Sequence, residues 1–433
     1  MSSETSQESL TRRDALNRSM TMAALAGAQM AWPSWMPRLA FAPKNSAQRG
    51  DTLVCVFMRG AADGLNIIVP HTEDAYYKAR PTLAVARPDD TTVDSTLRAL
   101  DLDGTFGLNP VLAPLLPIFK SGQMLAVHAA GSPDPTRSHF DAQAYMERGT
   151  PGSHALNNGW LARHLNTIDT GNSSPLRAVG WGSALQASLT GSVSSVAIAS
   201  IVNYHLAGRP DAAAAMLSTL NSLYGADDAS LKVASEQTQG VLDIVSKINV
   251  AAYKPANGAV YDPKNGYAMA FMQTAALIKA DVGLEVSAID IGGWDTHQNE
   301  DVDMAKAMGA LVEGLAAFHT DMGDQMSKVT VVTMSEFGRR LQENASKGTD
   351  HGHGGVMFVM GGHVTQKPVV TQWPTLAPDK LVNSTPGGGG DLAVTIDYRD
   401  VLAEILSLRL NNPALDQVFP NFTPTPRGIV TKS

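Results

Sequence analysis

Residues Val329–Gly355 read VTVVTMSEFGRRLQENASKGTDHGHGG, and they combine a strand pattern with a group of reactive side chains. The β-branched apolar run Val329–Met334 is typical of a strand buried on both faces. Glu336 follows this run almost directly. In an open α/β sheet the ligand site lies beyond the carboxyl ends of the strands. The segment therefore predicts Glu336 as a metal ligand at the functional edge of a sheet.

The end of the same segment carries a carboxylate and two imidazoles within four residues, namely Asp350, His351 and His353. Glycines between them allow the backbone to bend so that neighbouring side chains can converge. Another strand is expected directly afterwards, at Val356–Met360. We interpret this arrangement as one half of a metal site.

A second segment, Val286–His297, repeats the arrangement. The run Val286–Ile291 is rich in β-branched residues, and Asp295 and His297 follow it after two glycines. Two residues apart on a loop, both side chains can face one point. An isolated Asp-x-His is more often a turn with a hydrogen-bonded histidine, but its occurrence beside a second strand-then-acid segment favours a metal site.

Two further polar residues follow expected strands near the start of the chain. Asp63 comes after the apolar run Thr52–Met58, where it is either a metal carboxylate or part of an Asp-Gly turn. Ser138 follows the strand expected at Met124–Ala129 and precedes a helical stretch. It is either the N-cap of that helix or a nucleophile at a helix N-terminus, where free N–H groups favour an anion.

The alternation of strands and helices along the chain predicts an α/β fold with a mainly parallel sheet covered by helices on both faces. Glu300–Phe318 is amphipathic, with apolar residues at 4-3-4-3 spacing. Helices are expected also at 210–224, 230–250 and 266–279, and residues 205–282 are a candidate cap over the main domain. Further strands are expected at 176–179 and 196–199, and a closing helix at 395–408.

Composition limits the class of protein. The chain has 433 residues, 44% of them hydrophobic and 17% charged, as in a globular protein with a large core. Its net charge is 33 − 41 = −8 and it has no run of basic residues, which argues against nucleic acid as a partner. The single cysteine, Cys55, cannot form an internal disulfide and is expected to be a buried, inert thiol.

The first 42 residues are expected to be a signal segment. Paired arginines at Arg12-Arg13 precede a modestly apolar run, and Ala40-Phe41-Ala42 has the form of a cleavage site. This pattern resembles a twin-arginine export signal, which implies the twin-arginine translocase as a partner during export. The mature domain, residues 43–433, would then be periplasmic or secreted. No apolar stretch in it is long enough to span a bilayer.

Together these residues resemble a known family. The segments RGAADGLN, SHFDAQ, GGWDTH, SEFGR and TDHGHGG are similar to the twin-arginine-exported family catalogued as domain of unknown function 1501. The order of the strand-end residues also resembles the alkaline phosphatase superfamily, which includes sulfatases. The resemblance implies an alkaline-phosphatase-like fold, Asp63 as a first-strand metal ligand, and Ser138 as the nucleophile.

The resemblance also implies that Asp295 and His297 bind one metal, with His351 or His353 as the late histidine. Two departures from the superfamily pattern stand out. Phe337 follows Glu336 where the superfamily has a ligand histidine, and the pair Asp295-x-His297 is more tightly spaced than in phosphatases. The sulfatase motif Cys/Ser-x-Pro-x-Arg is absent from the sequence.

Two functions remain open. One is an exported metal-dependent hydrolase or transferase acting on phosphate- or sulfate-type esters, small or polymer-borne, with Arg137 or Arg339 binding the ester oxygens. The other is a catalytically degenerate superfamily member that acts as an exported, metal-containing binding or assembly protein. Carboxylates with imidazoles suit Zn²⁺ or Mn²⁺ better than Mg²⁺ or Ca²⁺. Acyl hydrolysis is disfavoured because the Gly-x-Ser-x-Gly elbow is absent.

Overall fold

The computed structural model describes residues 50–192, 194–204, 218–219, 238–245, 248, 250–383 and 389–432. The expected signal segment 1–42 lies outside these residues, and so do most of the positions expected to form helices between 210 and 250. Within the described ranges, no helix combines the length and the apolar character needed to cross a bilayer.

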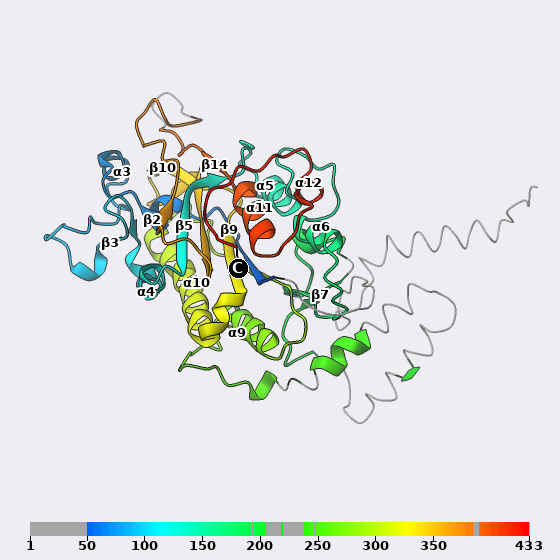
Figure 1. Cartoon of the computed structure of the whole chain (residues 1–433). Coiled ribbons are helices and arrows are strands. Elements are labelled where there is room, and N and C mark those ends of the chain that lie inside the picture. Colours follow the sequence, from blue (N-terminus) through cyan, green and yellow to red (C-terminus); the bar gives the residue numbers. More distant parts are fainter. Residues whose placement is uncertain are drawn as a thin grey trace, which may run out of the picture.

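A mixed, mostly parallel sheet forms the centre of the molecule (Figure 1). Its strand order is β13-β5-β12-β9-β1-β8-β6-β7, with β14 paired to β5. Strand β1 (Thr52–Met58) lies between β8 (Val286–Ile291) and β9 (Val329–Met334) and is parallel to both. Strand β12 (Gly355–Gly361) is antiparallel to both β9 and β5 (Met124–Gly131), so β5 and β9 run the same way. The carboxyl ends of β1, β5, β8 and β9 therefore share one edge.

The sequence-based expectation of an α/β fold with a mainly parallel sheet is confirmed. Three of the expected strands, β1, β8 and β9, begin and end where the sequence pattern predicted, because nearly every residue in them is buried. The strands expected at 176–179 and 196–199 are β6 (Ala178–Trp181) and β7 (Ser195–Ile198). The remaining strands of the sheet are β13 (Val369–Val370) and β14 (Ile396–Asp397).

Helices cover both faces of the sheet (Figure 1). One face packs against α9 (Gly266–Lys279) and α10 (Glu300–Met322), which place Phe271, Leu311 and Phe318 in the core. The other face packs against α6 (Trp160–Thr167), α11 (Tyr398–Leu408) and α12 (Leu415–Val418). Helix α9 thus belongs to the core of the main domain, although it falls in the range considered as a cap.

A short β-ribbon stands at the edge of the sheet where the functional residues were expected. Strand β10 (Arg339–Glu343) pairs in the antiparallel sense with β11 (Thr349–His351), and Arg339 faces His351 in the register. This corrects the interpretation of the segment as a loop. The ribbon is possible because β12 then returns through the sheet in the opposite direction to β9.

The other elements are short. Before β5 lie the 3-10 helix η2 (Pro110–Leu115) and α4 (Leu116–Lys120), which do not form one regular helix because Pro114 and Pro117 interrupt helical bonding. Outside the main sheet lie α2 (Gly64–Ile67), β2 (Ile68–Val69), α3 (Asp74–Ala79), η1 (Ser95–Leu97), β3 (Leu100–Asp101), β4 (Gly107–Leu108), α5 (His139–Arg148), η3 (Ala187–Leu189), η5 (Val250–Ala252) and η6 (Gly323–Lys328).

Candidate metal centre

Four side chains from distant parts of the sequence converge at the carboxyl edge of the sheet. His139 is the first residue of α5, which follows β5, while Asp295 and His297 lie on the loop after β8. His351 ends β11, the second strand of the ribbon that follows β9. Because β5, β8 and β9 run in the same direction, their following segments meet at one edge.

The ring nitrogens of the three histidines approach one another closely. The Nε2 atom of His351 lies 2.9 Å from Nε2 of His139 and 2.9 Å from Nε2 of His297. Oδ1 of Asp295 lies 3.2 Å from Nε2 of His351 and 3.2 Å from Nε2 of His297, and its Oδ2 lies 3.5 Å from Nε2 of His139. Within the described part of the chain, His139, Asp295 and His351 form a group whose ligand atoms could hold one ion.

Each imidazole also has a hydrogen-bond acceptor behind it. Nδ1 of His139 lies 2.7 Å from Oε1 of Glu336, and Nδ1 of His297 lies 3.2 Å from Oδ1 of Asp350. Nδ1 of His351 lies 3.0 Å from the carbonyl oxygen of Arg137. Carboxylate and carbonyl oxygens can only accept, so each Nδ1 is the protonated nitrogen.

The consequence is that the three imidazoles, when neutral, present their Nε2 lone pairs to one another and to the carboxylate of Asp295. Such an arrangement is repulsive unless a positive charge lies among these atoms. Histidine ligands of metals usually donate their other ring N–H to a carboxylate or carbonyl, as all three do here. The donor set of three imidazoles and one carboxylate therefore fits a cation such as Zn²⁺ or Mn²⁺.

The titration behaviour of the cluster follows from the same contacts. The hydrogen bond to Glu336 raises the pKa of His139, whereas burial lowers the pKa of His351. Burial opposes ionisation of Asp295, but its contacts outweigh burial and lower the pKa of that carboxyl group, chiefly because the guanidinium of Arg339 donates to its Oδ1. The lowered pKa of Asp295 favours its ionised form and the lowered pKa of His351 favours its neutral form, which are the forms that bind a metal ion.

Glu336 was predicted as a metal ligand, and the structure places it behind His139 instead. Its side chain is buried, and its Oε1 accepts hydrogen bonds from the backbone N–H of Gly60, from His139 and from Gln143. These contacts lower the pKa of Glu336 although burial opposes them. Asp350, also predicted as a ligand, likewise contacts Nδ1 of His297 and not the converging Nε2 atoms.

Arg339 was expected to bind an ester oxygen, but its side chain is fully buried. Its guanidinium donates to the carbonyl oxygens of Gly60, Ala61, Trp294 and Thr349 and to Oδ1 of Asp295. All of its side-chain nitrogens are therefore engaged inside the protein. Arg339 joins the loops after β1 and β8 to the ribbon, and it orients Asp295.

Asp63 does not reach the converging atoms. It caps α2 by accepting from the N–H of Leu65, and both of its oxygens accept from the guanidinium of Arg80. The Asp63 and Arg80 side chains are both fully buried. The negative charge of Asp63 is therefore balanced by an arginine, which corrects the prediction of Asp63 as a metal carboxylate.

The remaining predicted residues lie close to the cluster. Ser138 is the N-cap of α5, and its Oγ accepts from the N–H of Asp141 at 3.4 Å. The guanidinium of Arg137 pairs with the buried Asp391, and its side chain is 34% exposed, so one side of it faces solvent. His353 is half-buried near Asp391 and Arg137, and none of the converging atoms hydrogen bonds its ring in the described part of the chain.

His139 was the residue that sequence reasoning missed. The sequence pattern indicated a helix beginning at His139 and marked only Ser138 before it as a candidate functional residue. The available signal was the segment SHFDAQ, which follows a buried strand in the same way as the two predicted acid–imidazole segments. Phe337, at the position expected to have a histidine, is buried, and its ring lies 5.0 Å from the rings of His139 and His351.

Comparison with known protein families shows which family this chain belongs to. Residues 122–401 match the family described as "Protein of unknown function (DUF1501)". This match covers more than half of the sequence, so the chain belongs to that family. It includes Ser138 and all four converging side chains. No curated protein matches the sequence significantly.

Several solved structures are distantly similar in fold. The C-terminal periplasmic domain of EcEptC from Escherichia coli, in complex with Zn, has 9% identity and a TM-score of 0.36, covering 90% of this chain and 93% of that one. A protein in the alkaline phosphatase superfamily from Vibrio parahaemolyticus has 9% identity and a TM-score of 0.32, covering 82% and 72%. The lipoteichoic acid synthase LtaP from Listeria monocytogenes has 10% identity and a TM-score of 0.30, covering 73% and 66%.

Proposed function

We propose that this protein is a metal-dependent hydrolase or transferase that acts on phosphate- or sulfate-type esters, with Ser138 as the nucleophile. The observation that carries the proposal is the convergence of three Nε2 lone pairs on Asp295, each ring being held by an acceptor at Nδ1. His139, Asp295, His297 and His351 would hold the ion.

The cluster is open to solvent, which suits a catalytic site better than a structural one. The side chains of His139 and His351 are 24% and 21% exposed, and those of His297 and Asp295 are 43% and 48% exposed. Structural zinc sites are closed by four protein ligands, whereas catalytic sites keep a position for substrate or water. When bound, the ion would neutralise an anionic ester and lower the pKa of a nearby hydroxyl group.

Ser138 is the residue that this site offers as a nucleophile. It immediately precedes His139, and its Oγ stands at the N-terminus of α5, where the helix dipole favours negative charge. Its hydrogen bond with the N–H of Asp141, at 3.4 Å, is long, so the hydroxyl is weakly held. Arg137 is the arginine that can face an ester oxygen, since Arg339 is fully buried.

Replacing Ser138 by alanine tests the nucleophile. We expect Ser138→Ala to abolish turnover of aryl phosphate and aryl sulfate esters while metal content per protein stays unchanged. The stability loss should be about 1 kcal/mol, as for any lost helix cap. The matched control is Asn265→Ala, which removes the cap of α9 and should keep activity. If Ser138→Ala turns over esters at the wild-type rate, the serine is only a cap.

One observation favours the alternative, an exported metal-containing binding or assembly protein. Phe337 fills the space beside His139 and His351 with an apolar ring, where a further metal ligand would otherwise stand. Under this alternative the purified protein contains metal, and neither the wild type nor Ser138→Ala turns over any aryl phosphate or sulfate ester.

We infer further that the protein acts outside the cytoplasm, in the periplasm or after secretion. The support is the sequence pattern of Arg12-Arg13 followed by Ala40-Phe41-Ala42. Replacing both arginines by lysine should leave unprocessed precursor inside the cell, as detected by immunoblotting of fractionated cells. Normal processing of the double mutant would count against the twin-arginine route.

A further inference from the structure

One face of α5 carries a row of polar side chains that begins at the candidate metal centre. His139, Gln143 and Glu147 are each four residues apart, so they lie on the same side of the helix. This side faces the ends of β1 and β8 and the segment after β9, because its partners are Arg59, Glu336 and, through Arg59, Asp290.

Gln143 lies between His139 and Glu147 in this row and shares one hydrogen-bonding partner with each of them, Glu336 and Arg59 respectively. Its Nε2 donates to Oε1 of Glu336 at 2.8 Å, the same oxygen that accepts from His139. Its Oε1 accepts from Nη1 of Arg59 at 3.0 Å. A guanidinium can only donate and an ionised carboxylate can only accept, so the amide of Gln143 has one permitted orientation between them.

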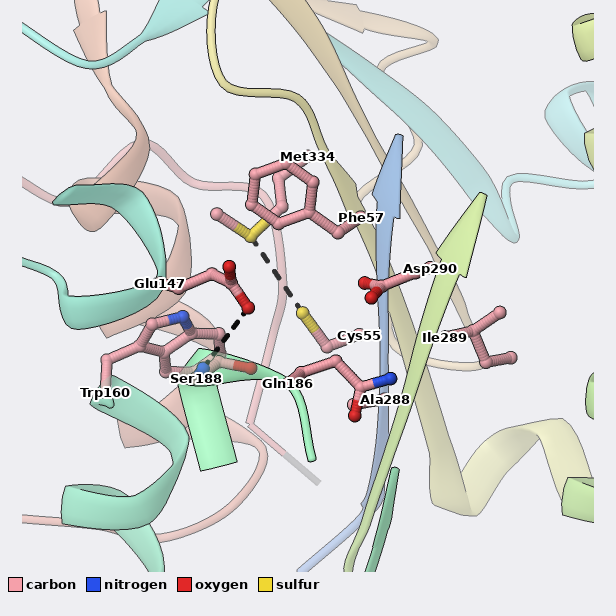
Figure 2. Close-up of a pocket in the computed structure, with 10 residues that line it drawn as sticks. All are labelled: Cys55, Phe57, Glu147, Trp160, Gln186, Ser188, Ala288, Ile289, Asp290 and Met334. Carbon is pink, nitrogen blue, oxygen red and sulfur yellow. Dashed lines mark hydrogen bonds between the residues drawn. The ribbon is translucent and has the colours of Figure 1, made fainter. Parts of the chain in front are cut away.

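Arg59 is held in turn by two carboxylates. It donates to both oxygens of Glu147 at 3.1 Å, and it lies 3.0 Å from Oδ1 of Asp290 on β8. Both carboxylate side chains line a small pocket beside Cys55, where Glu147 also accepts from the backbone N–H of Ser188 (Figure 2). Cys55 is buried there against Met334 and its pKa is raised, chiefly by burial, in agreement with an inert thiol.

We propose that Gln143 and Arg59 are positioning residues for His139, acting through Glu336, and this inference rests on the proposed metal centre. The sequence of contacts is Arg59 to Gln143, Gln143 to Glu336, and Glu336 to Nδ1 of His139. It fixes the plane of the His139 ring and keeps Nδ1 protonated, so that the lone pair of Nε2 points toward His351. Neither Gln143 nor Arg59 contacts the four converging side chains in any hydrogen bond of the described chain.

Gln143 can influence His139 because both donate hydrogen bonds to the same oxygen of Glu336. Oε1 of Glu336 accepts three N–H groups, and its Oε2 accepts from Ser335. Loss of the Gln143 donor leaves the carboxylate free to rotate toward its two remaining N–H groups, and the ring of His139 moves with it. Loss of Arg59 removes the donor that holds Oε1 of Gln143, so the Gln143 side chain is free to move away from the carboxylate of Glu336.

The first test is Gln143→Met, which keeps side-chain length and removes both hydrogen bonds. Metal-free protein is titrated with Zn²⁺ against a competing chelator, and with Co²⁺ by visible absorption. We expect zinc affinity to fall about tenfold, as for other outer-shell partners of metal-bound histidines, and the cobalt spectrum to change. The matched control is Gln273→Met, which removes a buried helical glutamine with two hydrogen bonds in another part of the core. It should lower stability and leave both metal readouts unchanged.

The second test asks whether Arg59 acts through Gln143. Arg59→Met should weaken zinc binding, and the double variant with Gln143→Met should bind no more weakly than Gln143→Met alone. Arg59→Lys, which keeps a donor, should recover part of the loss. Wild-type zinc affinity in Gln143→Met, or additive losses in the double variant, would overturn this inference alone. Wild-type protein that takes up neither ion would overturn it together with the proposed metal centre.

Discussion

Two clusters of ionisable side chains lie at the carboxyl edge of the sheet, and they balance charge in different ways. The first, which we call the buried carboxyl cluster, comprises Asp63, Arg80 and Glu300. The second is the candidate metal centre of His139, Asp295, His297 and His351. In the buried cluster every residue is inaccessible, and an arginine within the fold supplies the positive charge. In the candidate metal centre the side chains are partly exposed, and their lone pairs face one another.

The difference shows why an aspartate after a strand is weak evidence for a metal. Asp63 and Asp295 both follow strands that run the same way, and both contact an arginine. Arg80 takes both oxygens of Asp63 and is itself held by the carbonyl oxygens of Arg340 and Leu341. Arg339 takes only Oδ1 of Asp295, so the other oxygen remains directed at His139. Asp295, the candidate ligand, thus differs from Asp63 in having one carboxylate oxygen to which no arginine of the described chain donates a hydrogen bond.

The largest effect on stability is expected from removing Arg80, the positive charge of the buried carboxyl cluster. Arg80→Met leaves the buried carboxylate of Asp63 without a cation and should cost about 3–5 kcal/mol of unfolding free energy. Urea unfolding measures this loss. Zinc content per folded molecule should stay at the wild-type value, because the metal centre contains none of these residues. A variant that keeps its stability but loses its metal would show that the two clusters are one site.

The next effect concerns the metal centre itself. His351→Ala removes the imidazole at the centre of the three and should weaken zinc binding about a hundredfold to a thousandfold, the share of one ligand in a four-ligand site. Chelation should lower the melting temperature of the wild type and leave that of His351→Ala unchanged. His353→Ala is the matched control and should behave as the wild type. Equal losses in the two histidine variants would contradict the geometry.

A smaller effect follows from Glu300, which is buried beside Asp63. Burial, together with the charge of Asp63, raises the pKa of Glu300 from 4.5 to about 8. Between these values the folded protein keeps a proton that the unfolded chain releases, so stability falls as pH rises, by at most about 1.4 kcal/mol per pH unit. Glu300→Gln cannot titrate and should become more stable than the wild type as pH rises from 5 to 8. Parallel urea-unfolding curves for the two proteins at every pH would contradict this.

The strands of the fold were predictable because their residues are buried on both faces. Val286–Ile291 and Val329–Met334 are β-branched runs whose limits coincide with the sheet. The direction of β12 was not predictable, since an apolar run such as Val356–Met360 carries no information about its partners. For the same reason the ribbon of β10 and β11 was interpreted as a loop, although its pairing follows directly once β12 turns back.

The candidate site was predictable in residue type and less so in detail. Asp295, His297 and His351 lie together as the repeated strand-then-acid arrangement suggested, whereas their roles as ligands stay a prediction. Sequence spacing cannot separate an atom that faces a metal from one that holds a ligand, and Glu336 and Asp350 contact Nδ1 atoms. Sequence spacing also cannot identify which charged residue will pair with a given side chain in the fold. The pairing of Arg80 with Asp63 was therefore not predictable.

The central position of β1 also bears on how the chain folds. This strand is the first of the sheet to be synthesised, yet its neighbours are β8 and β9, which begin at Val286 and Val329. Such non-local pairing gives a high contact order, and folding of this kind is slow. A fragment ending before Val286 leaves both edges of β1 without a partner and open to pairing with other chains. Productive folding of this protein therefore waits until most of the polypeptide has left the ribosome.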